Sequence, residues 1–237
     1  MLPHQKVLRL ADAARRFFFR TGMLRSIWAE ESVDHEGNPL PWLSSPAIHY
    51  LDSLDLRGAR VLEFGSGNST LFWKKKCANG QIKHYHGIEY DKTYHAKMSA
   101  KDGFYRDKVV MTDEPRKYFH EVPYSLATNG TKNIQLFTPF DLTIVDGPIG
   151  LRERELDAAV HFTCSEGLIV VDDSNWIEAK VKDVCAERSL ARVDFAGFSP
   201  SVSYTKVTSL LFRNIGWLVG SRLNTPAGGM TQFPGMS

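Results

Sequence analysis

Short apolar runs recur along the chain beyond about residue 58, and polar or helix-forming stretches separate them. Five of these runs are nearly continuous, at residues 60–64, 84–89, 109–111, 140–146 and 167–172. Runs of this kind, each followed by roughly 10–20 residues able to form a helix, are typical of buried parallel strands in β-α units. The pattern therefore predicts an α/β fold built on a mostly parallel sheet.

The last two apolar runs are connected differently. Residues 191–198 and 208–212 are joined by a loop that contains Ser and Pro and no helical pattern. Strands joined without a crossover helix pair antiparallel. We expect a seven-stranded sheet that closes at its edge on an antiparallel last strand.

Helical spacing marks the N-terminal part of the chain. Apolar residues recur at this spacing from about Gln5 to Phe19, and a turn-rich stretch follows between Ser32 and Pro46. Pro46 then suits the first turn of a helix that Ser45 caps and that reaches Leu54.

These patterns divide the chain into three parts. We expect residues 1–57 to form a helical extension that covers the main domain, and residues 58–223 to form that domain. Residues 224–237 are rich in Gly, Pro and Thr and are expected to be a flexible tail.

Composition narrows the class of protein only slightly. The hydrophobic fraction of 43% and charged fraction of 24% are those of an ordinary globular protein. The net charge of +2 is too small to favour a nucleic-acid partner. No apolar stretch approaches the roughly 20 residues of a membrane span. The cysteines Cys77, Cys164 and Cys185 form no CxxC pair, as expected of reduced thiols in a cytoplasmic, intracellular protein.

The N-terminal segment is nevertheless basic. Before Trp28 only Asp12 opposes six basic residues, which are Lys6, Arg9, Arg15, Arg16, Arg20 and Arg25. A solvated helical face explains this bias, and so would an organelle-targeting peptide or a helix in peripheral contact with a membrane surface. The sequence leaves these readings open.

Acidic residues stand repeatedly where the predicted strands end. The positions are Glu89, Asp113, Asp146, Asp172 and Asp173, with Glu63 inside the first strand, two residues before its loop. Unpaired buried carboxylates are costly, so core packing explains this recurrence poorly. Ligands of open parallel sheets bind beyond the carboxyl ends of the strands. The acids therefore predict a binding site at this edge.

A glycine-containing loop follows the first strand. Gly65 and Gly67 permit a tight turn and close approach of a ligand, and Asn68, Ser69 and Thr70 can cap the next helix. Residues 61–70, VLEFGSGNST, resemble the first motif of class I, Rossmann-like S-adenosylmethionine-dependent methyltransferases, and a poorly characterised subgroup with a GSGNST loop in particular. The resemblance covers residues 41–213. It implies that the loop holds the amino-acid half of the cofactor, with Glu63 receiving its ammonium; the loop residues concerned are Gly65, Ser66, Gly67, Asn68, Ser69 and Thr70.

Further motifs extend the resemblance. Glu89, followed by Tyr90, corresponds to the acid that accepts the ribose hydroxyls, and Asp113 to the acid at the adenine edge. Residues 140–148, FDLTIVDGP, resemble the fourth motif, which implies that Asp146 faces the methyl-bearing end of the cofactor. By the same analogy, Trp42 to Pro46 would fold over the cofactor carboxylate.

The end of the fifth strand adds a metal hypothesis. Asp172 and Asp173, together with Asp146 and Asn175, are similar to the Mg²⁺ ligands of catechol-type O-methyltransferases, although the second member of the usual pair is Asp and not Asn. Such hard oxygen ligands suit Mg²⁺, which lowers the pKa of an acceptor hydroxyl. The alternative is that Asp172 or Asp173 caps the following helix.

The resulting hypothesis is methyl transfer from S-adenosylmethionine to a hydroxyl of a small molecule or glycan. Asp146, Asp172 and Asp173 are the candidate catalytic residues, and Tyr204 and Lys206, placed in the loop before the last strand, are candidates for the acceptor cleft. An NAD-dependent oxidoreductase is one alternative, which Glu63 and the replacement of the third loop glycine by Thr70 disfavour. A non-catalytic cofactor-binding or interaction protein is another. Oligomeric state and acceptor identity stay open.

Overall fold

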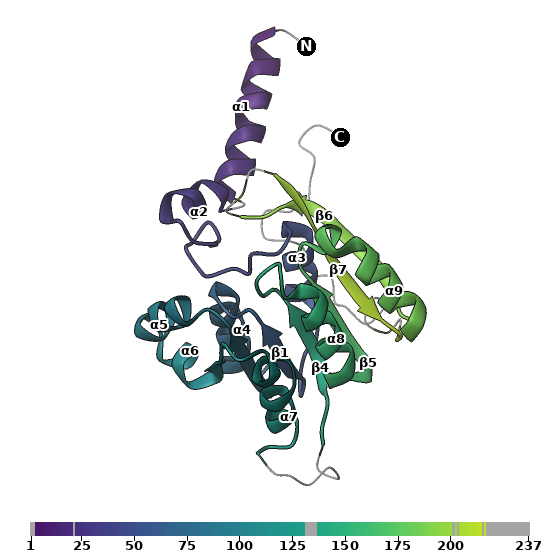
Figure 1. Ribbon diagram of the computed structural model, residues 1–237. Coiled ribbons are helices and arrows are strands. Elements are labelled where there is room, and N and C mark those ends of the chain that lie inside the picture. The colour runs from purple at the N-terminus through teal and green to yellow at the C-terminus, as the bar shows by residue number, and fades with distance from the viewer. Residues whose placement is uncertain are drawn as a thin grey trace.

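The computed structural model describes residues 3–20, 22–130, 137–200, 202, 204–214 and 216. Its centre is a seven-stranded sheet in the order β3-β2-β1-β4-β5-β7-β6 (Figure 1). The strands are β1 (Arg60–Phe64), β2 (His84–Glu89), β3 (Val109–Met111), β4 (Phe140–Val145), β5 (Thr163–Val171), β6 (Ala191–Phe198) and β7 (Thr205–Phe212).

The strand directions confirm the predicted architecture. β1 to β5 pair parallel, and β7 pairs antiparallel with both β5 and β6. The fold is therefore α/β, with a mostly parallel sheet and an antiparallel last strand. β7 begins at Thr205, earlier than predicted, so Lys206 lies in a strand and not in the preceding loop.

α1 (Pro3–Arg20) projects away from the sheet, and the short helix α2 (Met23–Ala29) follows at its base (Figure 1). Helices of the remaining chain cover both faces of the sheet; they are α3 (Ser45–Ser53), α4 (Asn68–Ala78), α5 (Lys92–Lys101), α6 (Gly103–Lys108), α7 (Val122–Ala127), α8 (Arg152–Phe162) and α9 (Glu178–Arg188), with a π turn at Lys117–Glu121 and a 3-10 turn at Ser174–Ile177. Neighbouring strand residues point to opposite faces. Val61 accordingly packs with α3 and α4, whereas Leu62 packs with the cluster that includes α7 and α8.

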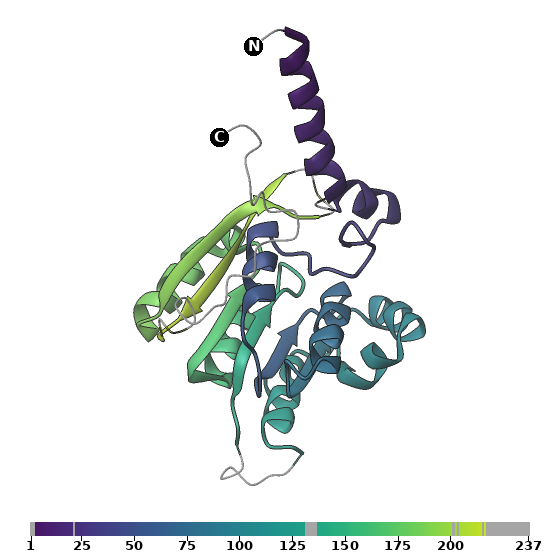
Figure 2. The ribbon, with the colours of Figure 1, turned by 180° about the vertical axis from the view of Figure 1, so that it is seen from behind.

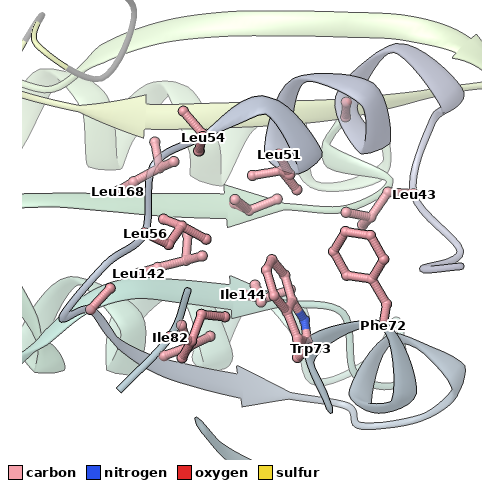
Figure 3. Close-up of a cluster of buried hydrophobic side chains, with 14 of the residues drawn as sticks. Leu43, Leu51, Leu54, Leu56, Phe72, Trp73, Ile82, Leu142, Ile144 and Leu168 are labelled. Atoms are coloured by element: carbon pink, nitrogen blue, oxygen red, sulfur yellow. The ribbon is translucent and has the colours of Figure 1, made fainter. Parts of the chain in front are cut away.

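The apolar core on the α3 face includes residues from well before the first strand. Leu51 of α3 and Trp73 of α4 are fully buried and lie near Ile144 of β4 and Leu168 of β5 (Figure 3). α3 is thus part of the same core as the sheet. This packing fixes the chain that leads into β1 and, with it, the loop that follows β1.

The N-terminal part differs in detail from the prediction. α1 is confirmed, whereas the short helix α2 was not predicted. Ser45 is the first residue of α3 and not its cap; Ser44 holds the cap position, but its Oγ donates to the Phe195 carbonyl at 2.8 Å instead of capping the helix. No helix of the described residues is long and apolar enough to cross a membrane. The predicted tail at residues 224–237 lies outside the described residues.

Candidate functional site

The loop after β1 is built around a glycine that no other residue replaces without strain. Gly65 has a φ of +78°, and a Cβ there would overlap the Asp146 carbonyl and the Gly147 backbone. The loops after β1 and β4 therefore meet directly. Gly65 N also donates to the Ile88 carbonyl at 2.9 Å, which brings the end of β2 to the same place.

Beneath this loop lies a buried carboxylate. Glu63 has no exposed surface, and its Oε2 accepts the Tyr85 hydroxyl. Its Oε1 has no hydrogen-bond partner among the described residues, and neither has the buried Ser66 Oγ. Burial raises the pKa of Glu63 to about 7, against the hydrogen bond from Tyr85. A buried acceptor without a donor is costly and suits a cationic or hydrogen-bonding ligand group.

The N-terminus of α4 opens onto the same loop. The cap position is Gly67, and no side chain in the described part of the chain caps the helix. The predicted capping by Asn68 and Thr70 is wrong because both side chains are engaged elsewhere. Asn68 Nδ2 donates to the Ser32 carbonyl at 3.3 Å, and Thr70 Oγ1 lies 2.8 Å from the Tyr85 hydroxyl. Uncapped helix N-termini bind anions through their free amides.

Gly67 is buried, and the side chain of Tyr94 lies close to this helix end. A Cβ on Gly67 would lie 2.8 Å from the Tyr94 hydroxyl, so Tyr94 of α5 borders the loop closely. Ser69 and Thr70 are buried, whereas Asn68 is partly exposed.

Glu89 forms the second wall of the site at the end of β2. Its Oε1 accepts the backbone amides of Tyr90 at 2.8 Å and Asp91 at 2.7 Å. Burial outweighs these bonds and raises the pKa of Glu89 to about 7. The amides fix the carboxylate through one oxygen. The Tyr90 ring packs edge-on against Tyr118, with centroids 5.2 Å apart.

Asp113 lies at the margin of this group. The Thr112 amide donates to the Glu89 carbonyl at 3.0 Å, which holds the end of β3 beside the end of β2. Asp113 itself is exposed. The structure thus brings together the loop from Gly65 to Thr70 with Glu89, and places Asp113 at the outer edge of the same surface.

The other half of the strand edge carries the remaining predicted acids, and two cations hold them together. Arg152 of α8 donates through Nη2 to Asp146 Oδ1 and through Nη1 to Asp173 Oδ2, both at 3.0 Å. Lys206 Nζ lies 2.5 Å from Asp172 Oδ2 and 3.3 Å from Asp173 Oδ2. We call these five residues the acid–base cluster.

This arrangement does not support the Mg²⁺ hypothesis. Among the described residues no group of His, Cys, Asp and Glu side chains is placed to hold a metal ion. The guanidinium of Arg152 and the ammonium of Lys206 occupy the positions that a cation would need. The capping alternative fails too: Asp173 precedes the 3-10 turn with a φ of +46°, but its side chain caps nothing.

Charge in the cluster is unbalanced, because three carboxyl groups share two cations. Burial raises the pKa of Asp172 well above its usual range, Asp146 adds to the shift, and Lys206 opposes it. Burial also raises the pKa of Asp146 to about 6, against the attraction of Arg152. Burial and the proximity of the two carboxyl groups thus raise the pKa of both Asp146 and Asp172.

The segment before α3 lies over the acid–base cluster. The Trp42 carbonyl accepts Lys206 Nζ at 2.7 Å and Ser199 Oγ at 3.3 Å. Thr208 links Asp172 Oδ1, at 2.9 Å, to the Ser44 amide, at 3.0 Å. The stretch from Trp42 thus contacts Lys206 and Thr208 of β7, and its Leu43 belongs to the same apolar cluster as Phe72 of α4 (Figure 3).

An apolar pocket of about 210 Å³ opens beside this segment. Its lining residues are Met23, Ser45, Pro46, Gly197, Phe198, Ser199 and Pro200. Ser199 belongs both to the lining and to the contacts of the Trp42 carbonyl. The pocket is therefore next to the acid–base cluster and at the same end of the sheet.

One further buried acid of this region, Glu155, was not predicted from the sequence. Glu155 of α8 accepts the Tyr118 hydroxyl at 2.8 Å and the Gly147 amide at 3.1 Å, and burial raises its pKa to about 7. Its contacts hold the loop after β4, beside Gly65. In the sequence, Glu155 is only an acid near the start of a helix. Acids are common there, so the sequence did not mark Glu155 as part of the site.

Comparison with known proteins identifies the fold. No family profile and no curated protein matches the chain. Among solved structures, the O-methyltransferase from Bacillus cereus in complex with SAH gives a TM-score of 0.53 at 14% identity, over 81% of this chain and 89% of that one.

Two further solved structures are similar over most of their length. One is the O-methyltransferase TomG from Streptomyces achromogenes, involved in tomaymycin synthesis and in complex with SAM. It gives a TM-score of 0.51 at 13% sequence identity, over 90% of this chain and 99% of that one. The other, cofactor-bound Rv0187 from MTB, gives a TM-score of 0.54 at 17% sequence identity, over 80% of this chain and 88% of that one. The chain has the class I, Rossmann-like methyltransferase fold.

Proposed function

We propose that this protein transfers a methyl group from S-adenosylmethionine to a hydroxyl of a small molecule or glycan. The observation that carries the proposal is the pairing at the first loop. Among the described residues, Glu63 Oε1 is a buried acceptor without a hydrogen-bond donor, and no side chain caps the α4 N-terminus beside it. An ammonium would bind Glu63 and a carboxylate would bind the amides of the α4 N-terminus. A ligand that carries both groups close together has an α-amino acid group.

The neighbouring residues fit the rest of that cofactor. Glu89 keeps a carboxylate at the next strand end, where it can accept two ribose hydroxyls. Tyr90 and Asp113 then border the adenine. The loop residues with the closest approach are Gly65, Ser66, Gly67, Asn68, Ser69 and Thr70, and their backbone forms the cradle. Two similar structures carry SAM or SAH, which supports this choice of ligand.

The acid–base cluster is proposed to serve the acceptor. When bound, the cofactor supplies an activated methyl group, so the protein must mainly align the acceptor and remove its proton. We assign Asp146 to the acceptor hydroxyl, because its loop meets Gly65 and its pKa of about 6 suits a base near neutral pH. Asp172 and Asp173 act through Lys206 and Arg152, which set the charge on Asp146. No step requires a metal ion.

The acceptor itself is proposed to enter by the apolar pocket. Its wall of Met23, Pro46, Phe198 and Pro200 suits a carbon skeleton, and it lies beside the cluster that would receive the hydroxyl. We further propose that residues 58–223 form the cofactor-binding domain, with residues 1–57 as its helical cover. The cover supplies Met23 and Pro46.

The cofactor assignment is tested by titration calorimetry with S-adenosylmethionine, S-adenosylhomocysteine and NAD. Glu89→Ala removes the proposed ribose contact, and Glu187→Ala on α9, an exposed acid, is the matched control. Two charge-assisted hydrogen bonds are worth about 3 kcal/mol, so Glu89→Ala should weaken binding about 100-fold while the control does not. Binding of NAD alone would contradict the proposal. No binding of any of the three would favour an interaction protein.

The acceptor assignment needs a separate assay. Hydroxylated small molecules and oligosaccharides are screened for release of S-adenosylhomocysteine, and any substrate is repeated with Asp146→Asn. The variant should retain S-adenosylhomocysteine binding and lose methyl transfer by about 100-fold or more, as expected of a base. Full activity in Asp146→Asn would refute the role of this residue.

A further inference from the structure

The N-terminal helices extend away from the rest of the molecule. α1 projects from the body in both views, and the chain then folds back through α2 (Figures 1 and 2). We call residues 3–29 the N-terminal arm. The arm is anchored at its base, because Met23 is buried and Ser26 Oγ donates to the Val33 carbonyl at 2.8 Å.

Large apolar side chains are exposed along this arm. Val7, Leu8 and Leu10 of α1 are 64%, 66% and 72% exposed. On α2, Leu24 and Ile27 are also exposed, and Trp28 is 92% exposed. Val7, Leu10 and Ala14 follow the spacing of one helical face. An aliphatic face of this kind is costly in water unless something covers it.

The charge of the arm indicates what covers it. Six basic residues and one acid precede Trp28, and the side chains of Lys6, Arg9 and Arg15 are exposed. A helix with an apolar face, basic flanks and an aromatic end is typical of a segment that lies in a membrane interface. The apolar face enters the headgroup region while the basic side chains reach lipid phosphates.

A second copy of the chain fits this surface less well. In a symmetric dimer the same patch faces itself, so each arm would bring its surplus positive charge against that of its partner. An anionic bilayer neutralises the same charge. We therefore propose that the N-terminal arm docks the protein onto anionic membrane surfaces. This proposal does not rest on the methyl-transfer activity, because it is argued from exposed residues of the arm and not from Met23, which lines the apolar pocket.

Cosedimentation of the full chain with lipid vesicles tests the proposal. Vesicles of phosphatidylcholine alone are compared with vesicles that also contain phosphatidylserine, at low and at high salt. Two arm variants are used: Arg9→Glu/Arg15→Glu removes the charge, and Val7→Glu/Leu10→Glu removes the apolar face. All four side chains are exposed, so both variants should keep the thermal midpoint of the wild type.

Two matched controls place the same changes elsewhere. Lys75→Glu/Lys83→Glu reverses two exposed lysines on the main domain, and Val110→Glu changes an aliphatic residue on β3 that is 39% exposed. They separate the arm from net charge and from general surface hydrophobicity. Circular dichroism of every variant checks that the fold is intact.

The expected result is salt-sensitive binding to the phosphatidylserine vesicles that is about tenfold weaker without the anionic lipid. Each arm variant should lose about tenfold or more in vesicle affinity, and each control should bind like the wild type. Absence of wild-type binding would overturn the proposal, as would arm variants that bind normally. A dimer in solution that Val7→Glu/Leu10→Glu converts to monomer would overturn it in favour of a second copy.

Discussion

Replacement of Lys206 by Met probes the acid–base cluster most sharply. The methionine side chain keeps most of the stem volume and removes the ammonium that lies 2.5 Å from Asp172 Oδ2. Lys206 is only 6% exposed and Asp172 is fully buried, so water cannot replace the lost charge. Removal of one partner from a buried ion pair costs about 3–5 kcal/mol, because the other charge is left uncompensated. We expect a loss of this size in the free energy of unfolding at about pH 8.

The loss should depend on pH. Without Lys206, the raised pKa of Asp172 rises further, so the folded state binds a proton that the unfolded chain releases. A folded pKa above the unfolded value makes stability fall as pH rises between the two values. The deficit of Lys206→Met relative to wild type should therefore shrink between about pH 8 and about pH 5.5.

Urea unfolding at both pH values measures these quantities. Lys180→Met is the matched control, because Lys180 pairs with Asp157 at 2.7 Å on the surface, where a pair contributes about 0–1 kcal/mol. Lys206→Met/Asp172→Asn should restore part of the stability, since it removes the unpaired charge. A deficit no larger than that of the control, or one that does not shrink at acid pH, would refute this account of the cluster.

Three further changes test the core, the loop and the buried acid, each by urea unfolding. Leu51→Ala should cost about 2–5 kcal/mol because it leaves a cavity in a fully buried site; a cost below about 1 kcal/mol would contradict the packing. Gly65→Ala should cost clearly more than the control Gly80→Ala, because both have positive φ but only the first meets neighbouring atoms; equal losses would contradict the close approach of the two loops. Glu63 has a folded pKa of about 7, above its unfolded value, so its contribution should lower wild-type stability by up to about 3 kcal/mol as pH rises from about 5 to 8. Glu63→Gln should lack that component of the pH dependence, and an unchanged profile would show that Glu63 is ionised throughout.

The sequence predicted the strands well because burial dictates their residues. Val61 and Leu62 face opposite layers, and both layers are apolar, so neighbouring positions of the strand are both apolar. α2 escaped prediction because it has only seven residues and exposes most of its apolar side chains. The cap of α3 was predicted one position too late, at Ser45 and not at Ser44. Ser44 Oγ makes a hydrogen bond to the distant Phe195 carbonyl, which local sequence spacing cannot show.

The site was predicted only where local sequence patterns mark its residues. The acids at strand ends are a local signal, and their convergence follows from parallel topology. The cations that pair with these acids are distant in the sequence. Lys206 reaches Asp172 because β7 lies beside β5 in the sheet, and Arg152 at the start of α8 reaches Asp173 in the loop after β5. The Mg²⁺ hypothesis counted the carboxylates without these cations. The roles of Tyr85 and Glu155 depend likewise on packing between separate elements.

A crystal structure of the protein with S-adenosylhomocysteine tests most directly whether the loop from Gly65 to Thr70 holds an adenosyl amino acid. We expect the ligand amino group to lie toward Glu63, its carboxylate at the α4 N-terminus and its ribose hydroxyls on Glu89. A ligand bound elsewhere, or bound with its ribose away from Glu89, would contradict this expectation.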